Sequence, residues 1–168
     1  MEITIREIYP FKERTFPDKI CFEPIGIIHT PFKSLKGIPI QFSISKYEGE
    51  IEVFTKFTPA LRDLDGFSHF YCLYYFDMVK LPVPLQSKLF LENDIKGVFA
   101  IRTPFRPNPI RLSILEVLEI KKYFNHIKNV DILIKTPRID IKPYASLFDS
   151  VQSTKIGWLK GKIMKKTI

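Results

Sequence analysis

The stretch Gly97-Val-Phe-Ala-Ile-Arg102-Thr-Pro104-Phe-Arg106-Pro107-Asn108-Pro109-Ile110-Arg111-Leu112-Ser113 joins two apolar runs through a proline-rich centre. The apolar runs predict a short strand over 98–101 and a longer strand over 110–120. Each proline fixes its own φ and disfavours helical backbone at the residue before it, so residues 105–109 are expected to form a stiff, extended loop. Arg102 and Arg106 would then be held ready for an anion, although composition alone favours a surface crossover with solvated arginines.

Length and composition limit the class of protein. A chain of 168 residues with 45% hydrophobic residues is expected to form one domain, with or without an appendage. The net charge of +8 is compatible with polyanionic partners, nucleic acid first among them, and also with a proteome that is rich in lysine throughout. Cys21 and Cys72 match neither a metal-ligand spacing nor a disulfide framework. With no signal peptide and no membrane-spanning run, we expect a cytoplasmic location and neither a membrane nor a metal partner.

The rest of the chain predicts a mainly β fold. Strands are expected at 25–28, 70–76, 123–127 and 130–134, with a hairpin over 43–57. A short helix is expected to begin at Thr58 and Pro59 and to end at Gly66 in a left-handed conformation.

The aromatic run at 70–76 is typical either of a strand buried on both faces or of the inner wall of a barrel. A small closed β-barrel with one or two short helices is favoured, because closure removes sheet edges. The expected domains are an N-terminal arm (1–23), the barrel (24–149) and a basic C-terminal tail (150–168) whose Trp158 could pack back or bind a partner.

Three side chains with acid–base chemistry alternate near the end of the expected barrel. Asp140, Lys142 and Tyr144 lie on one face if their segment is extended. A carboxylate beside an ammonium and a phenol can orient a substrate and move a proton. The alternative interpretation is a surface ion pair with a tyrosine packed over a turn.

Several strings together resemble the TsaA-like family, which includes tRNA methyltransferases. The most specific are Arg106-Pro-Asn-Pro-Ile110 and Asp140-Ile-Lys-Pro-Tyr144, with Thr136-Pro137 between them, and the resemblance covers about residues 24–149. It implies a small β-barrel that binds S-adenosylmethionine and forms a homodimer. The implied reaction transfers a methyl group to N6 of N6-threonylcarbamoyladenosine at position 37, in the anticodon stem-loop of tRNA.

The resemblance also implies roles for individual residues. For the implied reaction, the expected catalytic residues are Asp140, Lys142 and Tyr144, one of which would accept the proton of N6 or stabilise the resulting anion. The implied cofactor contacts are Gln41, Phe42, Phe76, Asp77, Arg102, Leu112, Lys128, Asn129, Val130 and Asp131. The residues expected to contact substrate are Arg106, Asn108, Arg111 and Lys135.

The chain departs from the family's pattern at several points. Ile40 stands where the family usually has arginine, and the histidine expected near Asp77 is missing. Arg111 stands where the family has glycine, and Ile134-Lys135 stands where it has Asp-Gly. These departures leave two alternatives open. One is a methyltransferase with another RNA or a small molecule as acceptor, and the other is a barrel that binds cofactor or RNA without catalysis.

Overall fold

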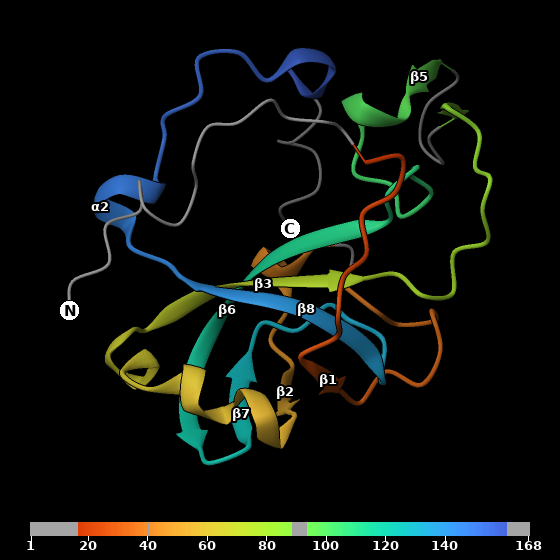
Figure 1. The fold of residues 1–168 in the computed structure, drawn as a ribbon. Coiled ribbons are helices and arrows are strands. Elements are labelled where there is room, and N and C mark those ends of the chain that lie inside the picture. The colour runs from red at the N-terminus through yellow and green to blue at the C-terminus, as the bar shows by residue number, and fades with distance from the viewer. Residues whose placement is uncertain (1–16, 40, 89–93, 161–168) are drawn as a thin grey trace, which may run out of the picture.

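The central element is a closed β-barrel. A computed structural model describes residues 17–39, 41–88 and 94–160. In these ranges six antiparallel strands close in the order β1-β2-β7-β6-β3-β8, and β4 pairs with β5 in a separate two-stranded sheet (Figure 1). The barrel strands are β1 (Gly26–His29), β2 (Glu48–Val53), β3 (His69–Tyr75), β6 (Ile110–Lys121), β7 (Phe124–Lys128) and β8 (Thr136–Pro143). The predicted fold class is confirmed.

The remaining described elements are short. The small sheet contains β4 (Gln86–Lys88) and β5 (Ile95–Gly97). The 3-10 turns are η1 (Phe42–Ile44), η2 (Thr55–Leu61), η3 (Leu64–Gly66), η4 (Val98–Ala100) and η5 (Gly157–Leu159), and α2 (Ser146–Asp149) is one α-helical turn. None of the helical elements in the described ranges is long and apolar enough to cross a membrane.

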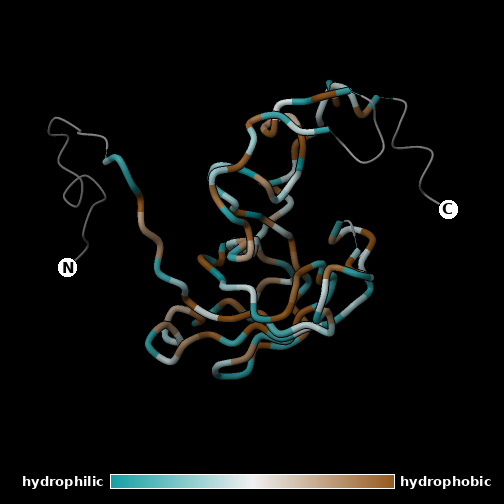
Figure 2. Tube along the Cα trace, turned by 90° about the vertical axis from the view of Figure 1, so that its right-hand side faces the viewer, coloured by the Kyte–Doolittle hydropathy of each residue, from teal (hydrophilic) through white to brown (hydrophobic). Residues whose placement is uncertain are grey.

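The core fills the barrel interior. Along β3, Phe70, Cys72 and Tyr74 are completely buried, whereas the residues between them are partly exposed. This alternation identifies the aromatic run as the inner wall of a barrel. Figure 2 shows the matching mixture of hydrophobic and hydrophilic residues along the strands. Burial raises the pKa of the Cys72 thiol to about 12, so this thiol is inert at neutral pH.

Two predicted strands are absent from the structure. The segment expected as a strand over 98–101 forms η4 at Val98–Ala100 instead, and the chain from Val130 to Ile134 has no strand pairing. The second segment lies between two left-handed residues, Asn129 and Lys135, each with φ of 67°. These residues turn the chain away from β7 and back into β8, so the intervening residues cross the end of the barrel.

Two further expectations fail between 43 and 66. Only Glu48–Val53 of the expected hairpin is a strand, and it pairs with β1 and β7. The expected helix is replaced by η2 and η3, with Pro59 inside η2 and the Thr58 hydroxyl bonded to the carbonyl of Thr55. The left-handed residue is Asp63, with φ of 64°, and not Gly66.

The ends of the chain are described only in part. Residues 1–16 of the expected arm and 161–168 of the expected tail lie outside the described ranges. Residues 17–25 carry no strand or helix before β1 begins. From α2, residues 150–159 run to the neighbourhood of β5, on the opposite side of the molecule in the view of Figure 1.

Candidate functional site

Three neighbouring strands present their outward side chains on one face of the barrel. Leu112 of β6 lies opposite Leu73 of β3, and Leu73 lies opposite Asp140 of β8. Two strand spacings separate Leu112 from Asp140 across this row, a distance of roughly 10 Å. In the next row Tyr71 lies opposite Lys142. Leu112, predicted to contact cofactor, therefore shares this face with two predicted catalytic residues.

A β-bulge in β8 places Asp140 on this outer face. Tyr74 pairs with Arg138, and the adjacent Leu73 pairs with Asp140, so Ile139 is an extra residue in β8. Strict alternation would put Asp140 on the same side as Arg138, inside the barrel. Because the bulge adds one residue, Arg138 faces inward and Asp140 faces outward.

The outward groups of β8 form an ion pair beside two tyrosines. Lys142 Nζ lies 3.0 Å from Asp140 Oδ2, and the backbone N–H of Ile141 donates to Asp140 Oδ1 at 2.9 Å. The Tyr144 ring packs edge-on against Tyr71, with 5.4 Å between ring centroids. Asp140 and Lys142 thus share one face, and Tyr144 packs on the tyrosine that pairs with Lys142. Their catalytic roles stay predictions.

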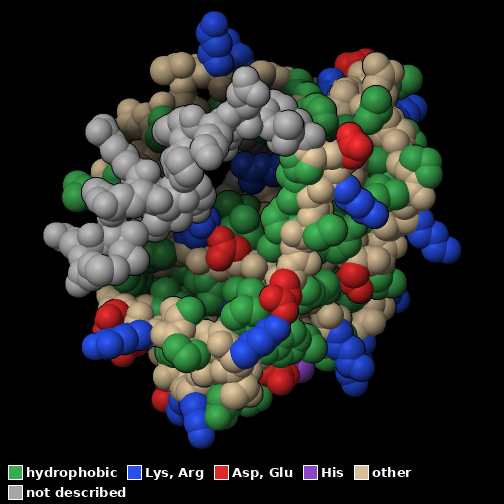
Figure 3. Space-filling model, viewed as in Figure 1, with side chains coloured by type: hydrophobic (Ala, Val, Ile, Leu, Met, Phe, Trp, Pro, Cys, Tyr) green, Lys and Arg blue, Asp and Glu red, His purple; other side chains and the backbone are tan. Residues whose placement is uncertain are grey.

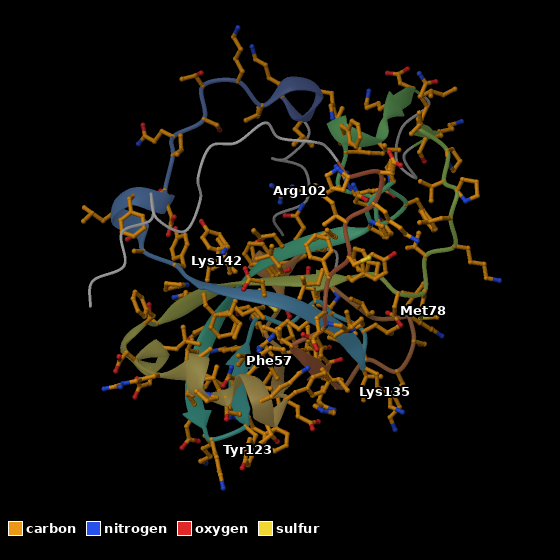
Figure 4. The ribbon with its side chains drawn as sticks, viewed as in Figure 1. Phe57, Met78, Arg102, Tyr123, Lys135 and Lys142 are labelled. Atoms are coloured by element: carbon orange, nitrogen blue, oxygen red, sulfur yellow. The ribbon has the colours of Figure 1, made fainter. Side chains whose placement is uncertain are left out.

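Arg102 lies above this face. Figure 4 shows Arg102 over the sheet from which Lys142 projects, and Figure 3 shows the same side of the molecule hollowed, with hydrophobic and charged side chains in the hollow. Arg102 is exposed and has no hydrogen-bond or ion-pair partner among the described residues. An arginine presented in this way is suited to bind a carboxylate or phosphate through two parallel hydrogen bonds.

Arg106 stabilises the turn that precedes Arg102. Its Nη1 atom donates to the carbonyls of Val98 and Ile101, both at 2.7 Å, and its guanidinium lies 5.5 Å from the centroid of the Phe99 ring. These bonds satisfy carbonyls that a strand would give to a neighbouring strand, and they explain why η4 replaces the expected strand. The substrate role predicted for Arg106 stays a prediction.

Arg111 points into one end of the barrel and binds Asp131. Arg111 Nη2 lies 2.5 Å from Asp131 Oδ2, the Ser113 hydroxyl donates to Asp131 Oδ1 at 3.2 Å, and Tyr74 Oη lies 3.1 Å from Ser113 Oγ. Alternation along β6 explains this, because Arg111 has the same parity as the buried Ser113. Arg111 was predicted to contact substrate and Asp131 to contact cofactor, and both roles stay predictions. In this structure the two side chains are bonded to each other.

Burial governs the charge of this network. The Asp131 side chain is fully buried, and burial raises the pKa of its carboxyl, while Arg111 and Ser113 oppose the rise. Burial also raises the pKa of Tyr74. Arg111 therefore compensates a negative charge inside the barrel end.

Other residues predicted to contact cofactor lie around the same end of the barrel. The segment from Gln41 and Phe42 leads to Ser45, whose hydroxyl bonds the carbonyl of Val130 at 2.5 Å. Asp131 follows Val130 in the chain. The segment that contains Gln41 and Phe42 and the segment that contains Val130 and Asp131 therefore lie next to each other. Lys128 and Asn129 end β7 immediately before Val130.

The remaining predicted site residues lie in different parts of the structure; they are Phe76, Asp77, Asn108 and Lys135. The Phe76 ring packs edge-on against Tyr74 with centroids 5.6 Å apart. Asp77 and Lys135 line a cleft of about 470 Å³ on the side of β1. Asn108 is exposed, and its carbonyl accepts the N–H of Ile110 at 2.8 Å. The structure therefore does not gather all the predicted substrate residues at one place.

Sequence reasoning missed Arg138. Its side chain is completely buried, and none of its guanidinium nitrogens has a hydrogen-bond partner among the described residues. Burial lowers its pKa to about 10, opposed by nearby Cys72 and Asp140. The only sequence signal that Arg138 points inward is its place in the alternation of β8. The bulge interrupts this alternation, so the signal cannot be recognised from the sequence. Across the described ranges, no three His, Cys, Asp or Glu side chains gather to form a metal site.

Fold and site together define a class: a small closed β-barrel whose outer face presents an aspartate–lysine ion pair, with an exposed arginine above it in Figure 4. The family described as the tRNA-methyltransferase O N-terminal domain matches residues 27–150. The chain belongs to this family.

Relatives and solved structures agree with this membership. A probable S-adenosyl-L-methionine-binding protein of Pyrococcus abyssi is 44% identical over 150 residues, which cover 89% of this chain and 81% of that protein. The tRNA (adenine(37)-N6)-methyltransferase of Escherichia coli is 33% identical over 141 residues, covering 77% of this chain and 60% of the enzyme. A crystal structure of TrmO superposes with a TM-score of 0.69 at 30% identity, covering 82% of this chain and 62% of that one. This chain thus spans about three fifths of the solved TrmO chain.

Proposed function

We propose that this chain is an S-adenosylmethionine-dependent methyltransferase that acts on tRNA at N6 of an adenosine, with N6-threonylcarbamoyladenosine at position 37 as the acceptor. The observation that carries the proposal is the Asp140–Lys142 pair, 3.0 Å apart on the barrel's outer face beneath Arg102. Relatives of the chain are named S-adenosyl-L-methionine-binding proteins and tRNA (adenine(37)-N6)-methyltransferases, which supports the cofactor and the substrate class.

The residues of this face fit S-adenosylmethionine. Arg102, which has no ion-pair partner among the described residues, is suited to the carboxylate of the methionyl group. Leu112 is 49% exposed on the same face and offers an apolar contact near the ion pair. When bound, the cofactor supplies a methyl group activated by its positive sulfur. The chain's own contribution is to orient that group and to exclude water from it.

Asp140 and Lys142 supply the acid–base chemistry. The N6 atom of the acceptor carries a carbamoyl group and is a poor nucleophile until its proton leaves. Asp140 Oδ2 accepts this proton, and the Lys142 ammonium stabilises the negative charge that develops on the acceptor. Tyr144, packed on Tyr71, limits the position of the incoming base. The net charge of +8 attracts the tRNA backbone, so tRNA binding weakens as salt increases.

Methyl transfer to purified tRNA tests the proposal. The wild-type chain is expected to label tRNA that carries N6-threonylcarbamoyladenosine and not tRNA that lacks this modification. Lys142→Ala and Asp140→Asn are expected to lower the single-turnover rate by about a hundredfold or more, while the affinity for cofactor stays unchanged. Lys46→Ala, an exposed lysine of the loop before β2, serves as the control.

Each alternative outcome has a distinct meaning. Equal labelling of tRNA with and without the modification would overturn the proposed acceptor. A wild-type rate in both variants would overturn the role of the ion pair. Cofactor binding without transfer to any tRNA would favour the non-catalytic alternative.

A cytoplasmic location and a homodimer belong to the same proposal. Both rest on the family, since tRNA-modifying relatives support the location and the resemblance implies the dimer. A sedimentation mass of 19.7 kDa at micromolar concentration would identify a monomer and contradict the dimer.

A further inference from the structure

The turn η4, which ends two residues before Arg102, is held from two sides. Arg106 Nη1 donates to the carbonyls of Val98 and Ile101 from within the proline-rich loop. The indole Nε1–H of Trp158 donates to the carbonyl of Ala100 at 2.8 Å, across a sequence separation of 58 residues. The backbone of this turn therefore accepts three side-chain hydrogen bonds immediately before Arg102.

Trp158 itself is fixed on this side of the molecule. It is half-buried within η5, and Lys96 Nζ lies 5.4 Å from the centroid of the indole ring. Lys96 belongs to β5, which leads directly into η4. The indole thus contacts both the strand before the turn and the turn itself.

The segment that brings Trp158 to this place begins at the other side of the candidate site. β8, which carries Asp140 and Lys142, ends at Pro143 and is followed by α2. Residues 150–159 then lead from α2 to η5 beside η4 (Figure 1). One continuous segment therefore connects the strand that carries the ion pair to the turn that precedes Arg102.

We propose that Trp158 is a positioning residue for ligand binding: its hydrogen bond to Ala100 fixes the turn and so holds Arg102 ready for the carboxylate of S-adenosylmethionine. This inference rests on the proposed cofactor. An arginine whose backbone is already ordered loses less conformational entropy when it binds an anion. The carbonyl of Ala100 is the link, because it lies two residues before Arg102 in the chain.

Calorimetric titration of Trp158→Phe with two ligands tests the proposal. Phenylalanine keeps an aromatic ring for Lys96 but has no N–H for the carbonyl of Ala100. S-adenosylmethionine contains the carboxylate that Arg102 would bind, and 5′-deoxy-5′-methylthioadenosine lacks it. The variant is expected to bind S-adenosylmethionine about threefold to tenfold more weakly, the effect of one hydrogen bond. Its affinity for methylthioadenosine is expected to stay unchanged.

A double-mutant cycle with Arg102→Ala provides the second measurement. If Trp158 acts through Arg102, Trp158→Phe has no further effect on S-adenosylmethionine binding in the Arg102→Ala protein. Val151→Ala, in the same segment with a side chain 84% exposed, is the matched control and is expected to bind both ligands as the wild type does.

The outcomes separate this inference from the proposed function. Equal weakening of both ligands would identify a general structural role for Trp158 and overturn the inference, as would independent effects in the cycle or no effect of Trp158→Phe. Failure of the wild-type chain to bind S-adenosylmethionine would instead overturn the proposed cofactor, and the inference with it. Binding by the wild type together with a carboxylate-dependent loss in the variant would support both.

Discussion

Two proline-containing stretches supply the main residues of the candidate site, and the structure holds them in different ways. Residues 136–143 become β8, whose backbone bonds to β1 and β3. Residues 98–109 pair with no strand, and side chains of Arg106 and Trp158 bond their carbonyls instead. The site therefore combines the hydrogen-bonded strand β8, which carries the ion pair, with a loop that side chains hold in place, which carries Arg102.

The largest effect is expected at the end of the proline loop, where Arg111 enters the barrel. Arg111→Met leaves the fully buried carboxylate of Asp131 without its cation, so we expect a loss of about 3 kcal/mol in the free energy of unfolding at neutral pH. Denaturant unfolding measures this loss. Arg62→Met, with a side chain 87% exposed, is the matched control and should lie within about 0.5 kcal/mol of the wild type.

The same substitution has a defined pH dependence. Burial raises the pKa of Asp131 in the folded protein, so its contribution to stability is fully present below the ordinary carboxyl pKa of 3.8 and is lost as pH rises through the folded value. Without Arg111 the folded pKa rises further. The gap between variant and wild type should therefore be smallest in acid and largest at neutral pH, and a gap that grows in acid would contradict this account.

The second effect concerns the loop that carries Arg102. Arg102→Ala should weaken S-adenosylmethionine binding by about tenfold to a hundredfold, because a charge-assisted pair of hydrogen bonds is lost. The free energy of unfolding should stay unchanged, since Arg102 has no partner among the described residues. Arg102→Lys should recover part of the affinity. If Arg102→Ala lowered the free energy of unfolding and left the affinity unchanged, Arg102 would have a structural role and not a binding role.

The third effect concerns the interior side of β8. Arg138→Met replaces a completely buried guanidinium that has no hydrogen-bond partner among the described residues with an apolar side chain of similar length. We expect the free energy of unfolding to increase by about 1 to 2 kcal/mol, because the penalty for burying the charge disappears. Thermal unfolding measures the change. A lower melting temperature would show that Arg138 stabilises the barrel despite its isolation.

The smallest effect is expected where β8 begins. Lys135 has a φ of 67°, a left-handed conformation that glycine adopts without strain. Lys135→Gly should therefore stabilise the fold by about 0.5 to 1 kcal/mol. Lys46→Gly, at a position without positive φ, should destabilise it slightly, and equal signs for the two variants would contradict the backbone explanation.

Strands are more predictable from the sequence than the loop that carries Arg102. The aromatic run at 70–76 predicted the strand β3, although it left open a strand buried on both faces or the inner wall of a barrel, and the apolar run after Pro109 predicted the long strand β6. η4 was not predictable, since one of the bonds that hold it comes from Trp158, distant in sequence. The role of Arg111 was also missed, because its partner Asp131 reaches the barrel end only after the chain turns at Asn129.

The shared face of Asp140 and Lys142 followed from their spacing, but its direction did not. Nothing in the sequence marks Ile139 as an extra residue, so the outward position of the pair depends on a bulge that only the structure reveals. For the same reason Arg138 was not recognised as an interior residue.

Because of the bulge at Ile139, the face on which Asp140 and Lys142 lie depends on how β8 pairs with β3. Before Ile139 the even-numbered residues of β8 face the barrel interior, and after Ile139 the even-numbered residues face solvent. If β8 kept its length but paired with β3 without the bulge, the rest of the strand would exchange inside for outside, and both charges of the pair would point into the core. Deleting Ile139 would remove the extra residue and restore regular alternation, so Arg138 would stay inside the barrel and Asp140 and Lys142 would stay outside.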